Sequence, residues 1–264
     1  KIPANTLPLD ANMQIMAKFE IGDGNFDIEV GVDPDYEALE MKVGSYINAE
    51  GKVVRDAADA VGIVFKMEAI GDDVPANYPV ALQGKTIAGY AVAIENVVVG
   101  RQTLNNEAIS SLVTTDATVT NGTQATEALL TGLGDVAFKT TYEKWVNEHL
   151  LDGESLSSWY IPTLNQLGEF MGMLFKVGEV EPTGGQAFRE MPEFAFENGV
   201  MFDRDPIESV YYASCTVNGS KDVSGVIINV DKTTKQVLDA KASSLKVTGS
   251  SQKALCRPMI TIFK

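Results

Sequence analysis

The chain has 264 residues, 45% of them hydrophobic and 22% charged, so it is long enough and apolar enough to bury a full core. Its 21 Lys and Arg residues stand against 36 Asp and Glu residues, which gives a formal net charge of -15. Binding to nucleic-acid phosphates needs clustered cations, so this charge argues against nucleic acid as a partner. The sequence has no run of about 18 apolar residues, and a transmembrane helix is not expected.

Residues 1–41 are predicted to form an extended segment with a small β-hairpin unit. The opening K-I-P-A-N-T-L-P-L-D-A-N is rich in proline and asparagine, a composition typical of an extended lead-in. We expect it to follow a removed export signal or a lipid anchor upstream of Lys1. Two runs of alternating polarity, 14–21 and 26–32, are joined by G-D-G-N, which indicates a hairpin.

Residues 42–264 are predicted to form the main domain, which begins with strands. V-G-S-Y-I-N-A-E-G-K-V-V indicates a second hairpin that turns at 48–51. Two nearly continuous apolar runs, 60–67 and 88–95, indicate strands that are buried on both faces. The Ser-, Thr- and Gly-rich residues 110–123 are interpreted as a connection or an irregular strand.

Two helices are expected in the middle of the chain. The first has a buried face with helical spacing, and Asp135 is expected to cap its start. The members of this face are Phe138, Tyr142, Trp145 and His149.

The second helix is predicted to start at a sharp corner, where Pro162 ends a strand formed by W-Y-I. Thr163 and Gln166 match a capping box, which starts a helix. Its expected buried residues are Leu164, Leu167, Phe170, Met171 and Leu174.

The last third of the chain is predicted to be a long loop followed by strands. Residues 176–208 have the pattern of neither helix nor strand, whereas the chain from Val210 onward alternates like antiparallel strands. The order of elements is therefore strands, two helices, a long loop and strands again, which indicates an α+β fold.

The motifs, taken in order, resemble a known family. G-S-Y-I-N-A-E-G, A-V-G-I-V-F, G-Y-A-V-A-I, W-Y-I-P-T-L-N-Q-L, Y-Y-A-S-C and C-R-P-M-I-T-I-F are similar to the motifs of exported Bacteroidetes proteins. These proteins are related to the Fibrobacter succinogenes major paralogous domain and the DUF1566 group. The resemblance covers about residues 42–264. It implies a C-type-lectin-like fold, a twisted antiparallel sheet with two helices and a long irregular loop region.

The resemblance implies a binding or adhesion role at the cell surface, with a glycan or a cell-surface protein as partner. It implies no catalytic residue and no cofactor. Loops on rigid scaffolds usually carry binding, so the ligand surface is expected in the long irregular region. The candidate ligand-binding residues are Arg189, Glu193, Asp203, Arg204 and Asp205.

Cys215 and Cys256 fall in two predicted strands that this fold would place in one sheet, and both depart from the family pattern. In an exported protein they are candidates for a cross-strand disulfide, and two buried reduced thiols are the alternative. A third alternative is cysteine chemistry of the formylglycine-generating kind, which shares the fold class, although the wider motifs of those enzymes are missing.

Three further groups are interpreted as structural. Residues 159–162 are expected to pack at the corner and not to form an aromatic platform for sugar. His149, the only histidine, is expected to be partly buried. Asp203, Asp205 and Glu208 offer oxygen ligands for calcium, but a solvated acidic turn is the favoured interpretation.

The leading hypothesis is therefore an exported cell-envelope binding protein that acts in adhesion or polysaccharide recognition and is not an enzyme. The main alternative is a structural fimbrial or surface-assembly subunit, whose N-terminal strands pair with a neighbouring chain by strand addition. The cysteine-dependent oxidoreductase is the second alternative.

Overall fold

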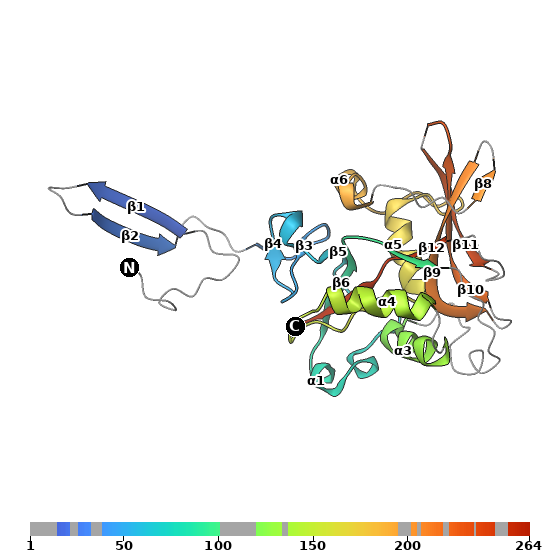
Figure 1. The fold of residues 1–264 in the computed structure, drawn as a ribbon, viewed down its shortest axis with the longest axis horizontal. Coiled ribbons are helices and arrows are strands. Elements are labelled where there is room, and N and C mark those ends of the chain that lie inside the picture. The colour runs from blue at the N-terminus through green and yellow to red at the C-terminus, as the bar shows by residue number, and fades with distance from the viewer. Residues whose placement is uncertain are drawn as a thin grey trace.

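The computed structural model has a mixed α+β fold, in which helices pack against two sheets built largely from antiparallel strands (Figure 1). This class agrees with the prediction from the order of the motifs. Within the part of the chain that is described, no helix is both long enough and apolar enough to cross a membrane. The described residues are 15–21, 26–32, 39–100, 120–133, 137–194, 202–204, 207–218, 222–234, 236–245 and 253–264.

β1 (Ile15–Ile21) and β2 (Phe26–Val32) form an antiparallel hairpin, as the two alternating runs predict. All seven residues of each strand are paired, from Ile15 with Val32 to Ile21 with Phe26. Neither strand pairs with another strand in the described ranges. The division of the chain after residue 41 stays a prediction.

The first sheet contains, in spatial order, β13 (Met259–Phe263), β6 (Ile87–Ala93), β5 (Gly62–Lys66), β3 (Tyr46–Ile47) and β4 (Val53–Val54). β3 and β4 form the second predicted hairpin. Gly51 in its turn adopts a φ of 81°, a left-handed conformation that glycine accepts without strain. β6 is buried along its whole length and β5 in all but its last residue, which confirms the expected burial on both faces.

The second sheet contains, in spatial order, β11 (Val237–Leu245), β10 (Asp222–Asp231), β9 (Ile207–Asn218), β12 (Lys253–Cys256) and β7 (Val97–Gly100), with β8 (Phe202–Arg204) paired to β9. β9 to β12 confirm the predicted all-β region from Val210 onward. The prediction that residues 176–208 contain neither helix nor strand is wrong in part, because α6 (Gln186–Arg189) and β8 lie within them and β9 begins at Ile207. β9 and β12 are parallel neighbours, and the other pairs in this sheet are antiparallel.

Arg257 ties together the two segments that pass from one sheet to the other. It lies between β12 and β13, and its guanidinium donates to Asn96 Oδ1 at 3.2 Å and to the Ile94 carbonyl at 3.1 Å, both between β6 and β7. It also donates to the Glu193 carbonyl at 3.0 Å. Desolvation by burial lowers the pKa of Arg257 to about 10, although the electrostatic influence of Tyr212, Glu193 and Glu95 acts in the opposite direction.

The helices are α1 (Val80–Gln83), α3 (Gly122–Leu133), α4 (Ala137–Glu148), α5 (Leu164–Leu174) and α6 (Gln186–Arg189). α3 and α4 share one hydrophobic core with the two sheets, to which Leu129 and Tyr142 belong. α5 packs over a second core, which contains Leu167 and Phe170. α4 and α5 are the two predicted helices, and the expected cap residue Asp135 lies outside the described residues.

α3 corrects the interpretation of residues 110–123 as a connection, because the helix begins at Gly122. The earlier part of that stretch lies outside the described residues. Ala125 and Leu129 are one helical turn apart and both are buried, so α3 is held by the core against which it packs. Its glycines at both ends have low helix propensity, which hides the helix in the sequence.

The corner at Pro162 has the predicted helix start. Thr163 Oγ1 accepts a hydrogen bond from the Gln166 backbone N–H at 3.3 Å, and Gln166 Oε1 accepts one from the Thr163 N–H at 3.1 Å. W-Y-I is not a full strand, because only Tyr160 forms a bridge, to Met259. All of residues 159–162 are buried, which agrees with their interpretation as corner packing.

Candidate functional site

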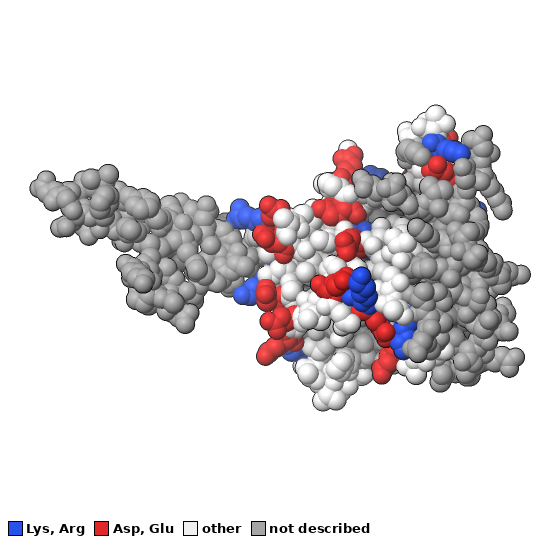
Figure 2. Space-filling view, viewed as in Figure 1, with Lys and Arg blue, Asp and Glu red and all other residues white. Residues whose placement is uncertain are grey.

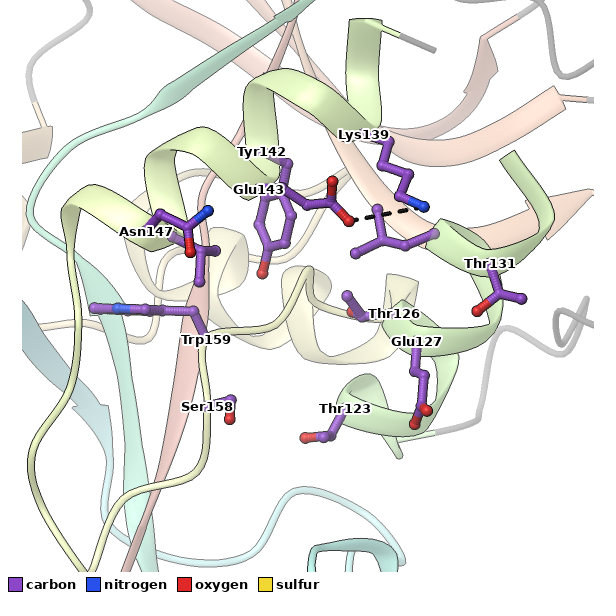
Figure 3. Close-up of a pocket in the computed structure, with 12 residues that line it drawn as sticks. Thr123, Thr126, Glu127, Thr131, Lys139, Tyr142, Glu143, Asn147, Ser158 and Trp159 are labelled. Carbon is purple, nitrogen blue, oxygen red and sulfur yellow. Dashed lines mark ion pairs between the residues drawn. The ribbon is translucent and has the colours of Figure 1, made fainter. Parts of the chain in front are cut away.

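A groove of about 530 Å³ lies between α3 and α4 (Figure 3). This volume is in the range of small-molecule sites. Two stripes of polar side chains line its walls, and in each stripe the residues are four positions apart, so they share one face of their helix. The stripes are Thr123, Glu127 and Thr131 on α3 and Lys139, Glu143 and Asn147 on α4.

The floor of the groove is made by side chains that also belong to the first core. Figure 3 shows the Tyr142 ring pointing from α4 into the space between Trp159 and Thr126. Tyr142 is 2% exposed and Trp159 is 5% exposed. Both rings are therefore fixed by packing before any ligand arrives, and rigid groups of this kind lose little entropy when they bind.

The floor and the α3 wall each contain one buried hydroxyl that no described residue pairs with. The buried Tyr142 Oη has no hydrogen-bond partner, and the same is true of Thr123 Oγ1. Thr126 differs, because its hydroxyl donates to the Ile161 carbonyl at 3.0 Å and accepts from the Ile161 N–H at 2.9 Å. Buried polar groups in proteins are nearly always paired, so these two oxygens are exceptions, and with less than 1 Å² of accessible surface each they lie beneath the groove surface.

Burial raises the pKa of the Tyr142 hydroxyl well above its ordinary value. The group is therefore uncharged near neutral pH, and it can both donate and accept a hydrogen bond. Such a partner suits the hydroxyl groups of a ligand better than it suits an ion.

An aromatic cluster supports the part of the groove floor that contains Trp159. Its indole N–H donates to the His149 carbonyl at 2.8 Å, and its ring meets Trp145 edge-on at 5.2 Å between centroids. The His149 ring stacks on Trp145 at 4.2 Å, and its Nε2 lies 3.2 Å from Glu95 Oε1. His149 is half-buried, which confirms its interpretation as a partly buried residue.

The residues predicted to bind ligand do not line this groove in the described part of the chain. Arg189 is exposed at the end of α6. Glu193 is half-buried, and its Oε1 accepts from Tyr46 Oη at 2.9 Å, which fixes it to the first sheet. Asp203 and Arg204 belong to β8, whose side chains are outside the description, and Asp205 lies outside the described residues. The ligand role of these five residues stays a prediction.

Cys215 and Cys256 lie on neighbouring strands of one sheet, as expected, and both are buried free thiols. In this structure the two cysteines are free thiols, and the disulfide stays a prediction. Burial raises the pKa of Cys215 to about 12 and that of Cys256 further. Thiols that are protonated and buried are poor nucleophiles.

A buried carboxylate lies near the first sheet. Asp73 is 3% exposed and accepts from Tyr78 Oη at 2.5 Å, from Tyr90 Oη at 2.7 Å and from Asn77 Nδ2 at 2.9 Å. Tyr78 also shares a 2.7 Å hydrogen bond with Thr261. This network fixes the segment before α1 to the sheet and offers a ligand no opening, because both tyrosines are buried.

Among the described residues, no group of three or more His, Cys, Asp or Glu side chains is arranged to hold a metal ion. Of the three candidate calcium ligands, Asp203 lies in β8 and pairs in register with Glu208 in β9, and Asp205 lies outside the described residues, so the solvated acidic turn stays a prediction. Comparison of the chain with protein-family models, curated proteins and solved structures gives no significant match.

Proposed function

We propose that this chain is an exported, non-enzymatic binding protein of the cell envelope, which recognises a glycan in the groove between α3 and α4. The ordered motifs support kinship with the Fibrobacter succinogenes major paralogous domain group and a C-type-lectin-like fold. The mixed α+β architecture, with two helices over one core and a third over the other, is compatible with that fold.

The observation that carries the proposal is the pair of unpaired buried hydroxyls, Tyr142 Oη and Thr123 Oγ1. Both oxygens are covered in the ligand-free protein, so a ligand rich in hydroxyl groups pairs with them only when the side chains over them move, and it meets the exposed amide of Asn147 and hydroxyl of Thr131 on the walls first. Polar groups held by a rigid scaffold around a partly apolar floor are the usual composition of a specific small-molecule site.

A glycan-array screen of the full chain, followed by calorimetric titration of each hit, tests this proposal. Tyr142→Phe and Thr123→Val remove the two hydroxyls with little change in shape, and each is expected to weaken binding about fivefold to tenfold. Thr183→Val is the matched control, because Thr183 is exposed near α5 and away from the groove. A glycan array without any hit would overturn the proposal. It would also be overturned if Tyr142→Phe and Thr123→Val bound a hit as tightly as the control Thr183→Val.

A structural surface subunit is the second candidate, and the β1–β2 hairpin favours it. An isolated two-stranded hairpin is marginal in water, and these strands pair only with each other among the described residues. A subunit that assembles by strand addition should self-associate. The test is sedimentation over a concentration series, with the full chain and with residues 39–264. If this candidate is right, the full chain should assemble and residues 39–264 should not.

A further inference from the structure

The β1–β2 hairpin has one face that is wholly hydrophobic. Neighbouring residues of a strand lie on opposite faces, and residues that are paired across two strands lie on the same face. The register pairs Phe19 with Ile28 near the middle of the hairpin, so the residues two positions away in each strand share their face. This apolar face consists of Ile15, Ala17, Phe19 and Ile21 in β1 and Phe26, Ile28, Val30 and Val32 in β2. Hydrophobic surface of this extent is unfavourable in water and requires a cover.

The other face of the hairpin is charged. It consists of Met16, Lys18, Glu20, Asp27, Glu29 and Gly31. Glu20 and Asp27 are paired directly opposite each other, an arrangement of like charges that is least unfavourable when water surrounds both. The charged face is therefore expected to stay in solvent, and packing is left to the apolar face.

Two kinds of cover are disfavoured. The first is the rest of the same chain, because neither strand pairs with another strand among the described residues and Figure 1 shows the hairpin apart from both sheets. The second is an anionic lipid surface. The chain has a net charge of -15, and Figure 2 shows Asp and Glu side chains spread over the visible described face, so such a surface would repel it. The surface of another protein molecule is therefore the cover that fits.

The residue sizes on the apolar face fit a second copy of the same face. From the open end of the hairpin to its turn, the four pairs are Ile15–Val32, Ala17–Val30, Phe19–Ile28 and Ile21–Phe26. The second pair is the smallest, and the third is one of the two largest. If two hairpins stack in opposite directions about a two-fold axis, the second pair of each copy meets the third pair of the other, so small residues lie against large ones. Stacking in the same direction would place the two smallest pairs together and leave a gap.

The area of the face is also sufficient. Full burial of a Val, Ile or Phe side chain removes roughly 60–120 Å² of apolar surface from water. With Ala17 left out, two copies of the face would bury roughly 800–1,700 Å² in total, which overlaps the range of about 1,200–2,000 Å² for stable interfaces.

We propose that two copies of the chain form a dimer in which the apolar faces of their β1–β2 hairpins stack in opposite directions. The four strands then make a small β-sandwich with the charged faces outward. An isolated two-stranded hairpin is marginal in water, so hairpin and dimer stabilise each other. This interface is independent of the groove between α3 and α4.

The test is sedimentation of the full chain at concentrations from about 1 to 300 µM, where the native chain is expected to reach a dimer and no larger species. Phe19→Glu places a carboxylate on the apolar face and is expected to raise the dissociation constant of the dimer at least about a hundredfold. Met16→Glu is the matched control, because it adds the same group to the charged face of the same strand, opposite Gly31. Its dissociation constant should stay within about threefold of the native value.

A second pair of variants tests the packing without adding a charge to the hairpin. Phe19→Ala is expected to weaken the dimer at least about tenfold, because it removes a large residue from each copy. Adding Ala17→Phe to Phe19→Ala exchanges the two sizes, and the facing pairs of an oppositely directed stack then contain the same residues as before. The double variant should therefore dimerise within about threefold of the native chain.

A native chain that stays monomeric over the whole range overturns the proposal. Growth beyond a dimer also overturns it, because assembly by strand addition leaves an open edge on each added hairpin. The same holds for equal weakening by Phe19→Glu and Met16→Glu, or for a double variant that dimerises no better than Phe19→Ala. A closed dimer that Phe19→Glu abolishes and the double variant restores supports the stacked hairpins.

Discussion

Replacing Tyr142 with Phe is expected to make the ligand-free protein more stable. The substitution keeps the ring that packs in the first core and removes only the unpaired hydroxyl. A buried polar group without a partner costs roughly 1–3 kcal/mol, so the free energy of unfolding should rise by about that amount. For a chain of this size, each kcal/mol corresponds to an increase in Tm of about 2–4 °C.

Urea unfolding followed by circular dichroism measures this difference, if the slope of the transition is the same in both proteins. Tyr46→Phe is the matched control, because it is the same chemical change at a hydroxyl that donates to Glu193 Oε1 at 2.9 Å. That variant should lose about 0.5–1.5 kcal/mol. The two substitutions are therefore expected to act with opposite signs.

A Tyr142→Phe protein that is equally stable or less stable would refute the reasoning. It would mean that Tyr142 Oη has a full partner in the free protein, and the groove would then have no unused hydrogen-bonding capacity to offer a ligand. If the Tyr142→Phe protein is more stable and also binds glycan more weakly, the hydroxyl that destabilises the free protein is the one that the glycan contacts.

Three other predictions concern buried charges and thiols. Arg257→Met should lower the free energy of unfolding by roughly 3–5 kcal/mol, measured in urea, because it leaves three buried acceptors without their donor. Burial raises the pKa of Asp73 above its usual range, despite the hydrogen bonds it accepts, so its contribution to stability is complete below about pH 4 and is lost as pH rises. Unfolding in urea from pH 4 to pH 7 should therefore show Asp73→Asn gaining stability relative to the native chain, and a change in the other direction would show that the hydrogen bonds outweigh desolvation. Cys215 and Cys256 should resist a thiol reagent at pH 8 in the folded protein and react in urea, since both are buried and burial raises the pKa of each thiol.

The elements that the sequence predicts well are those with local signals. The capping box of Thr163 and Gln166 needs only four adjacent residues, and the structure has both of its hydrogen bonds. The buried face of α4 follows from spacing along one helix, and Phe138, Tyr142 and Trp145 are buried as expected. Such signals depend on a few neighbouring residues, so no long-range contact is needed to interpret them.

The groove depends on contacts that a single helical pattern does not contain. Its walls belong to two helices, and one of these, α3, has weak helical signals because Gly122 begins it and Gly132 lies near its end. Glu193 was predicted to bind ligand because it lies in a long loop, yet its carboxylate meets Tyr46, 147 residues away in the chain. A general preference of binding sites for loops could not anticipate that pairing.

Helical spacing predicts that Tyr142 is buried, but it does not predict that the hydroxyl of Tyr142 lacks a partner among the described residues. Its position on the helix places the ring in the core, and Phe would fill the same space without an unpaired hydroxyl. An unpaired phenolic hydroxyl in such a place makes the free protein less stable, and we propose that the ligand is what pairs with it. Tyr at position 142 is expected to make the ligand-free protein less stable than Phe would. A ligand contact is therefore sought first at this position.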